Sequence, residues 1–228
     1  MNKILRSELL KLKGSFALNL ILILAIIQLS TIPLYLYSTN NSVVIENIIF
    51  LPMLGYCILA PIFSILLHEQ EEKANSFQNI KSEKNRATLW GMKLISTDLL
   101  MFLLGVPVWV VVGFEFGRLS YYIYVAVTTW LLLILLNHFH MLLSLIIGKG
   151  GNLVIAFIEC LFIIFATNKV FLNSFWLPIA LPVNLILEFG ENKIFMNIMY
   201  LIGFIILLYI CNLAVVNRFE IQKIDKKW

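Results

Sequence analysis

Charged residues are scarce in this sequence, and their scarcity excludes a water-soluble fold. Only 13% of the 228 residues are Asp, Glu, Lys or Arg, and 61% are hydrophobic. An ordinary soluble domain has about 25% charged residues. Because an aqueous fold cannot bury so much apolar surface, we expect an all-α integral membrane protein.

Cysteines and catalytic motifs are also few. The cysteines are Cys57, Cys160 and Cys211. All lie within apolar runs, which argues against a disulfide framework. The zinc-protease pattern H-E-x-x-H is absent, and His138 and His140, two residues apart on a helix, point to opposite faces and cannot share a metal. The only Gly-Lys pair, Gly148-Lys149, lacks the flanking residues of a phosphate-binding loop.

Long apolar runs predict six transmembrane helices, because crossing a bilayer takes about 20 apolar residues. The predicted spans are Phe16–Tyr37, Ile48–Leu67, Leu94–Phe116, Tyr121–Ile147, Leu153–Thr167 and Ile194–Val216. We find no internal repeat or linker, so residues 1–228 are expected to form a single domain.

A seventh apolar stretch, Val170–Leu187, is interrupted by Pro178 and Pro182. We expect the segment 168–193 to be re-entrant or interfacial and to lie outside the cell. Its aromatic and proline residues predict an outer-leaflet cap where a substrate enters, or else ordinary interfacial belt residues. The cap residues are Phe171, Phe175, Trp176, Pro178 and Pro182.

The distribution of Lys and Arg predicts that both termini are cytoplasmic. With that orientation only Arg118, Lys169 and Lys193 face outside, and all other basic residues lie inside. The membrane orientation therefore explains the net positive charge of the chain, and no nucleic-acid partner is needed to explain it. Residues 1–13 place Leu5, Leu9 and Leu12 on one helical stripe, which is typical of an amphipathic helix at the membrane interface.

The segment 69–93 is the charged interruption between two apolar runs, and we predict a cytoplasmic loop there. Phe77 and Ile80 give it a small apolar face among polar residues. That face favours a docking site for another protein, with Phe77 inserted into its partner. The alternative is a solvated connector.

Two parts of the sequence carry recognisable motifs. One is SELLKLKGS before the first span. The other is the cytoplasmic loop, with Glu72, then Asn75-Ser76-Phe77, Lys84-Asn85-Arg86 and Leu89-Trp90-Gly91-Met92-Lys93. Both parts resemble the ABC-2 type transporter permeases, and in particular the small permease subunits of lantibiotic immunity transporters. The chain length, the six spans and the proline-broken segment before the last span are similar as well.

The resemblance implies a permease that is not itself an enzyme and binds no cofactor. ATP and Mg²⁺ would be bound by a separate ATPase subunit, in two copies, which docks on the loop. The docking residues would be Glu72, Asn75, Ser76, Phe77, Ile80, Lys84 and Arg86. A second, homologous permease would complete the path, and the substrate would be a lantibiotic-like amphipathic peptide, exported from the lipid of a Gram-positive bacterium's cell membrane.

Three other functions stay open at this point. The first is a permease for bacitracin-like or other amphipathic molecules. The second is an integral-membrane enzyme, for which the sequence offers no nucleophile or metal cluster. The third is a non-transporting membrane assembly protein, in which the loop docks something other than an ATPase.

Four polar residues are expected inside the membrane: Asn137, His138, His140 and Glu159. Such groups are costly in lipid and usually face the bundle interior. Glu159 is expected at the depth of His140 or Asn137 on the preceding helix, so either can be its hydrogen-bond partner. The pair would join two helices, or it would take part in a pathway or gate. Asp98, near the inner end of its span, is expected to be a boundary residue.

Overall fold

The computed structural model describes residues 2–39, 42–73, 85–172, 174–191 and 193–218. Within these residues all regular structure is helical and no strand occurs, which confirms the all-α membrane fold. The helices are α1 (Asn2–Leu12), α2 (Phe16–Ser38), α3 (Ser42–Lys73), α5 (Arg86–Gly105), α6 (Pro107–Glu115), α7 (Leu119–Ile146), α8 (Gly148–Thr167), α9 (Leu181–Leu187) and α10 (Ile194–Arg218).

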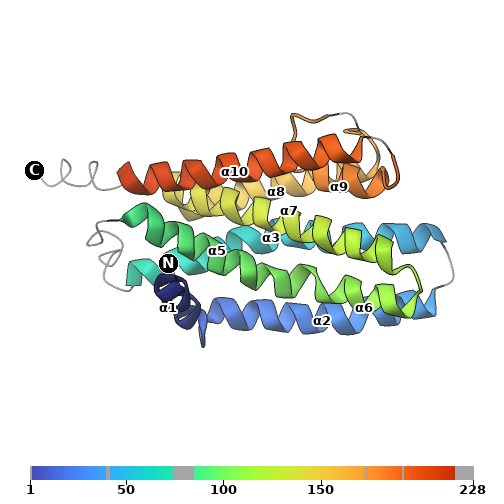
Figure 1. The fold of residues 1–228 in the computed structure, drawn as a ribbon, viewed down its shortest axis with the longest axis horizontal. Coiled ribbons are helices and arrows are strands. Elements are labelled where there is room, and N and C mark those ends of the chain that lie inside the picture. The colour runs from blue at the N-terminus through green and yellow to red at the C-terminus, as the bar shows by residue number, and fades with distance from the viewer. Residues whose placement is uncertain (1, 40–41, 74–84, 173, 192, 219–228) are drawn as a thin grey trace, which may run out of the picture.

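Six of the described helical segments are long and apolar enough to cross a membrane, with α5 and α6 together forming one of them. They run in alternating directions, so α1 and the end of α10 lie at the same end of the bundle (Figure 1). We name this the proximal end, where α3, α7 and α10 finish and α2, α5 and α8 begin. The opposite, distal end carries α9 (Figure 1).

The helix α3 extends beyond the predicted span Ile48–Leu67 in both directions. Glu69, Glu71 and Glu72 therefore lie on its last turns rather than in the loop, and Arg86 opens α5. Glutamate is a good helix former, and Glu71 is held by ion pairs described below, so nothing stops the helix at the end of its apolar run. The connector between α3 and α5 is accordingly shorter than the predicted 69–93.

The predicted third span, Leu94–Phe116, is divided at Val106 into α5 and α6. Pro107 has no N–H and cannot continue the hydrogen-bond ladder of α5, so the helix restarts there. Near the break, the Thr129 hydroxyl of α7 donates to the carbonyl oxygen of Gly105 at 3.2 Å.

The segment before the last span does not cross the bundle. It folds into turns followed by α9, which has only seven residues. Leu181–Ile186 are all buried, because α9 packs against α7, α8 and α10. The Asn184 side chain donates to the carbonyl oxygen of Phe171 at 2.7 Å and fixes the preceding turns on α9.

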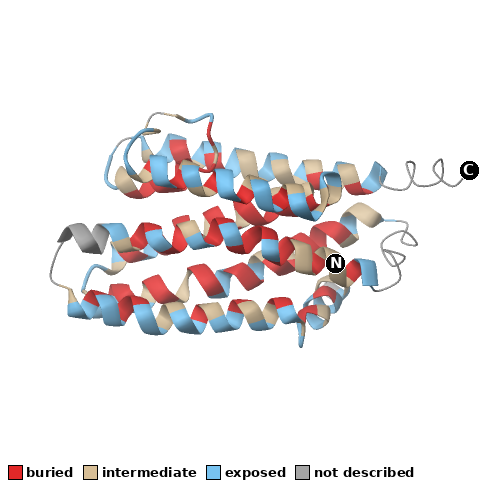
Figure 2. Ribbon diagram, turned by 180° about the vertical axis from the view of Figure 1, so that it is seen from behind, coloured by how far each residue is buried: buried red, intermediate tan, exposed pale blue. Residues whose placement is uncertain are grey.

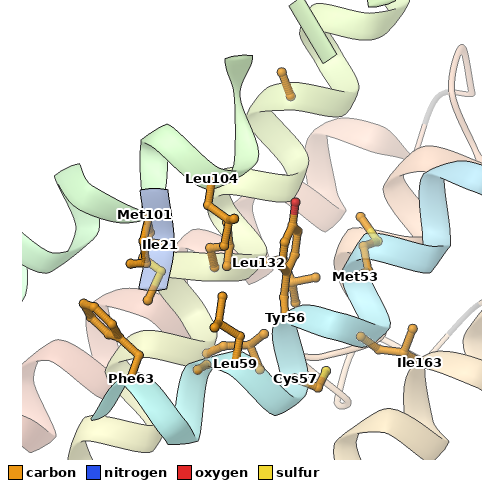
Figure 3. Close-up of a cluster of buried hydrophobic side chains, with 14 of the residues drawn as sticks. Ile21, Met53, Tyr56, Cys57, Leu59, Phe63, Met101, Leu104, Leu132 and Ile163 are labelled. Carbon is orange, nitrogen blue, oxygen red and sulfur yellow. The ribbon is translucent and has the colours of Figure 1, made fainter. Parts of the chain in front are cut away.

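The apolar core runs along the middle of the bundle, and the outward faces of the helices are exposed (Figure 2). Ile21, Met53, Tyr56, Met101, Leu104 and Leu132 meet there from α2, α3, α5 and α7 (Figure 3). The helix α7 is central, since it packs against α3, α5, α6, α8, α9 and α10. It is therefore the element through which polar groups on different helices are connected.

Candidate functional site

One face of α7 carries polar groups toward α5. Asn137 Nδ2 donates to Asp98 Oδ1 at 2.8 Å and to Thr97 Oγ1 at 2.8 Å. His138 Nε2 lies 2.9 Å from Asp98 Oδ2. Asp98 thus stands in the middle of α5 and joins it to α7, which corrects its assignment as a boundary residue. Its carboxylate stays in the bundle because two side chains of α7 bind it there.

The other face of α7 carries His140 toward α8. His140 Nε2 lies 2.8 Å from Glu159 Oε2, and His140 Nδ1 lies 2.6 Å from Asn152 Oδ1. Of the two partners expected for Glu159, the structure therefore has His140, whereas Asn137 faces α5. Because Asn152 Oδ1 can only accept a hydrogen bond, His140 Nδ1 donates to it, and His140 Nε2 and Glu159 Oε2 share the second hydrogen bond.

Hydroxyl groups extend this network to α3. Asn152 Nδ2 lies 2.9 Å from Ser64 Oγ and 2.8 Å from Ser144 Oγ, and the two serine oxygens are 3.0 Å apart. Ser64, Ser144 and Asn152 are all buried. The side chains of three helices, α3, α7 and α8, are thereby connected in the proximal half of the bundle.

A third set of contacts joins α10 to the same region. Asn212 Nδ2 donates to the carbonyl oxygen of His138 at 2.8 Å, and Trp90 Nε1 donates to Asn212 Oδ1 at 3.3 Å. An added Cβ on Gly91 would collide with the Tyr209 hydroxyl. The Leu89–Lys93 stretch therefore makes the close contact between α5 and α10.

An apolar cleft of about 240 Å³ lies between α7, α8, α10 and the segment before α9. Among the described residues that line it, Glu159 is the one ionisable group, and Phe139, Phe162 and Leu208 are typical of the rest. Ile158 and Leu207 also line it and expose 45% and 54% of their area on the outside of the bundle. The cleft therefore opens toward the surface that lipid would cover, with the His140-bound carboxyl group at its inner wall.

The predicted cap residues do not form one surface. Pro178 lines the cleft, whereas Pro182 is buried within α9. Phe175 stacks on Tyr200 with ring centroids 5.2 Å apart and is exposed, as is Trp176. Phe171 packs against Phe162 and Phe165.

A cluster of charges lies at the proximal end, which we name the ion cluster: the buried Glu8, Glu71 and Lys93 and the half-buried Lys11. Lys93 Nζ lies 2.6 Å from Glu71 Oε1, and both side chains are about 5% exposed or less. Lys11 Nζ lies 2.6 Å from Glu8 Oε1 and 3.7 Å from Glu71 Oε1. The cluster joins α1 to the end of α3 and to the first half of α5.

Lys11 remains charged in this cluster. Burial lowers the pKa of Lys11, but its hydrogen bond to Glu8 and the charges of Glu8 and Glu71 raise the pKa by more, to above its ordinary value. The Gln70 side chain also donates to the carbonyl oxygen of Lys11 at 3.1 Å. Outside the cluster, Lys149 of α8 forms an exposed ion pair with Glu69 at 2.7 Å.

Most of the predicted docking residues lie outside the described residues, namely Asn75, Ser76, Phe77, Ile80 and Lys84. Glu72 is described and is exposed on the last turn of α3, and Arg86 is half-buried at the start of α5. The two described docking residues therefore flank the connector, beside the ion cluster.

Sequence reasoning did not place several residues in the polar network, namely Ser64, Thr97, Asp98, Ser144, Asn152 and Asn212. It also missed the ion cluster, because Glu71 and Lys93 were assigned to a loop. A signal was present, since each polar residue inside an apolar span needs a partner in the bundle. Pairing every such residue by depth would have brought Asp98 to His138.

Comparisons of the chain with protein-family models, curated proteins and solved structures find no match. In the part of the chain that the structure describes, no group of three or more His, Cys, Asp or Glu residues can hold a metal ion. The candidate site thus consists of the ion cluster, the polar contacts on both faces of α7, and the cleft.

Proposed function

We propose that this chain is a permease subunit of an ATP-driven exporter of the ABC-2 type, which removes lantibiotic-like amphipathic peptides from a Gram-positive cell membrane. A separate ATPase, in two copies, docks at the proximal end, which is cytoplasmic. A second permease subunit completes the path. The resemblance of the loop and the N-terminal stretch to such permeases supports this function, and the six-span fold is compatible with it.

The observation that carries the proposal is the position of the ion cluster. The end of α3 and the start of α5 flank the connector, and the buried Glu71 and Lys93 pair ties these two helices together. A displacement of the connector by a bound ATPase would therefore act on the proximal ends of both helices rather than on one of them. α1 moves with them, because Glu8 and Lys11 belong to the same cluster.

The helices α3 and α5 both reach the cleft through α7. Asp98 of α5 binds His138, and Ser64 of α3 binds Ser144 and Asn152. His140 and Glu159 then connect α7 to the wall of the cleft. ATP binding can shift this arrangement only if the ATPase dimer binds the two states of the permease with different affinity.

The cleft suits the apolar part of an amphipathic peptide. It faces the lipid side of the bundle, is lined by apolar side chains and includes Pro178 from the predicted cap. A peptide inserted in the outer leaflet would enter it laterally, without passing through water. Because His140 binds Asn152 and Glu159 and so holds α8 against α7, widening the cleft would require α10 to move away from α7.

A protection assay in a peptide-sensitive Gram-positive host tests the proposal. The chain is expressed with the ATPase and second permease encoded beside it, and the minimal inhibitory concentrations of a lantibiotic, of bacitracin and of a non-peptide antibiotic are measured. We expect protection against the lantibiotic that is lost when the ATPase carries an inactive Walker motif. Protection that survives this inactivation would contradict an ATP-driven exporter.

Two variants connect the assay to the structure. Glu71→Gln leaves Lys93 buried beside a neutral group, so protection should fall although the chain still reaches the membrane. Glu69→Gln removes only the exposed partner of Lys149 and serves as the matched control. Equal protection by both variants would mean that the ion cluster does not transmit the motion.

A further inference from the structure

A second cavity, which we name the vestibule, lies at the distal end and has a volume of about 950 Å³. It is enclosed by the end of α6 and the start of α7, by α3, by α9 and by the residues that follow α8. Its lining includes two cations, Arg118 and Lys169, with Ser120 between aromatic residues such as Phe116, Tyr121 and Phe189. None of these residues takes part in the proposed transport of peptide.

Neither cation of the vestibule forms an ion pair in the part of the chain that the structure describes. No described carboxylate forms an ion pair with Arg118 or Lys169, and no lining residue is acidic. Glu188, which stands between the lining residues Leu187 and Phe189, is not in the lining and accepts a hydrogen bond from the Asn197 side chain at 2.9 Å. The described lining residues therefore carry two positive charges and no negative one.

Lys169 occupies a position at which glycine would be more favourable. It follows α8 with φ of 63°, in the left-handed region. The N–H of Lys169 bonds to Ala166 O at 2.9 Å, and that of Val170 bonds to Phe165 O at 3.2 Å. This is the Schellman helix ending, in which the left-handed residue is usually glycine. A lysine here strains the backbone, which suggests that its side chain has a role the helix end does not require.

The vestibule lies where apolar helices end, which is the level expected for lipid headgroups. Arg118 directly precedes α7 and Lys169 follows α8, so both lie where transmembrane segments end. In the aromatic wall the rings of Tyr121 and Phe189 pack edge to face, with centroids 4.9 Å apart. Cations for a headgroup and aromatic rings for the first methylene groups thus lie in one cavity.

We propose that the vestibule binds a phospholipid with an anionic phosphate headgroup, with Arg118 and Lys169 contacting the phosphate oxygens. The adjoining aromatic residues cover the glycerol and upper acyl carbons. Binding would fix the loop between α6 and α7 against the segment that follows α8. This site is independent of the exported peptide and of the ATPase.

Native mass spectrometry of the purified full chain in detergent tests the site. Phosphatidylglycerol and phosphatidylcholine are titrated separately, and glycerol phosphate supplies the headgroup without acyl chains. We expect phosphatidylglycerol to bind more tightly than phosphatidylcholine. Arg118→Gln and Lys169→Gly should each weaken its binding about five-fold, the effect of one cation near a lipid headgroup.

The variants separate binding from folding. Lys169→Gly removes the cation and also relieves the left-handed strain, so the chain should be at least as stable as the wild type while it binds the lipid less well. Lys193→Gln changes a distal cation that does not line the vestibule, and it should leave binding unchanged. Three results would each overturn the proposal. They are an equal loss of phosphatidylglycerol binding in Lys193→Gln, no loss of that binding in Lys169→Gly, and binding of glycerol phosphate as tight as that of phosphatidylglycerol.

Discussion

The two polar faces of α7 resemble each other in composition but differ in how completely they are bonded. Each pairs one histidine with one carboxyl group, His140 with Glu159 toward α8 and His138 with Asp98 toward α5. On the α8 side both nitrogens of His140 have partners. On the α5 side His138 Nδ1 and Asn137 Oδ1 are buried without a hydrogen-bond partner among the described residues.

This difference indicates which contact can rearrange. A fully bonded buried network loses bonds in any movement, whereas atoms without partners have less to lose and can gain a new one. We infer that α7 and α8 move together and that the contact of α5 with α7 is the adjustable one. An adjustable contact is expected of α5, because α5 starts at the connector and we propose that the ATPase binds the connector.

The largest effect is expected from His140→Leu. It leaves the Glu159 carboxyl group buried without its partner, and a buried polar group that loses its partner costs about 1–3 kcal/mol, or more where the group is charged. Unfolding in detergent by SDS titration measures the free energy. The double variant His140→Leu with Glu159→Leu should recover most of the loss, and an equally unstable double variant would contradict the pairing.

A smaller loss is expected from His138→Leu on the α5 side. Asp98 keeps its hydrogen bond from Asn137, and 14% of its side chain is exposed. The free energy of unfolding should fall by about 1–2 kcal/mol, within the range for a buried group that loses one partner. The same SDS titration compares both histidine variants, and a loss equal to that of His140→Leu would remove the distinction between the faces.

Asn212→Leu tests the contact with α10. It removes the hydrogen bonds to Trp90 and to the His138 carbonyl group. Side-chain hydrogen bonds between membrane helices average about 0.6 kcal/mol, so a loss of about 1 kcal/mol is expected. Trp90 fluorescence, with the other tryptophans replaced, should shift on the same substitution, and an unchanged spectrum would mean that the two side chains do not touch.

Ser144→Ala should have the smallest effect. Asn152 keeps its bond to Ser64 at 2.9 Å, so the network stays connected. A loss of about 0.5 kcal/mol is expected, close to the average for one such bond. If Ser144→Ala lowered the free energy of unfolding by more than Asn212→Leu does, the serine hydroxyl groups would contribute more to stability than the asparagine amide groups.

The sequence predicted the spans well because the cost of charge in lipid is a strong constraint on composition. It predicted their ends less well, since Glu69 and Glu71 continue α3 by bonding to residues distant in the chain. Depth alone restricted the partner of Glu159 to His140 or Asn137, and the structure has His140. Asp98 was assigned to the span boundary because the sequence of α5 alone does not show that His138 of α7 lies beside it.

The most direct test of the proposed function is co-purification of the tagged chain with the ATPase encoded beside it. Wild type is compared with Phe77→Ala and with Phe175→Ala, a distal aromatic control. We predict that wild type and the control retain the ATPase, and that Phe77→Ala loses it while remaining monodisperse. If Phe77→Ala retained the ATPase at the wild-type level, docking on the connector would be contradicted. If the ATPase co-purified with neither the wild type nor any variant, the proposal that the chain is an ABC permease subunit would be contradicted.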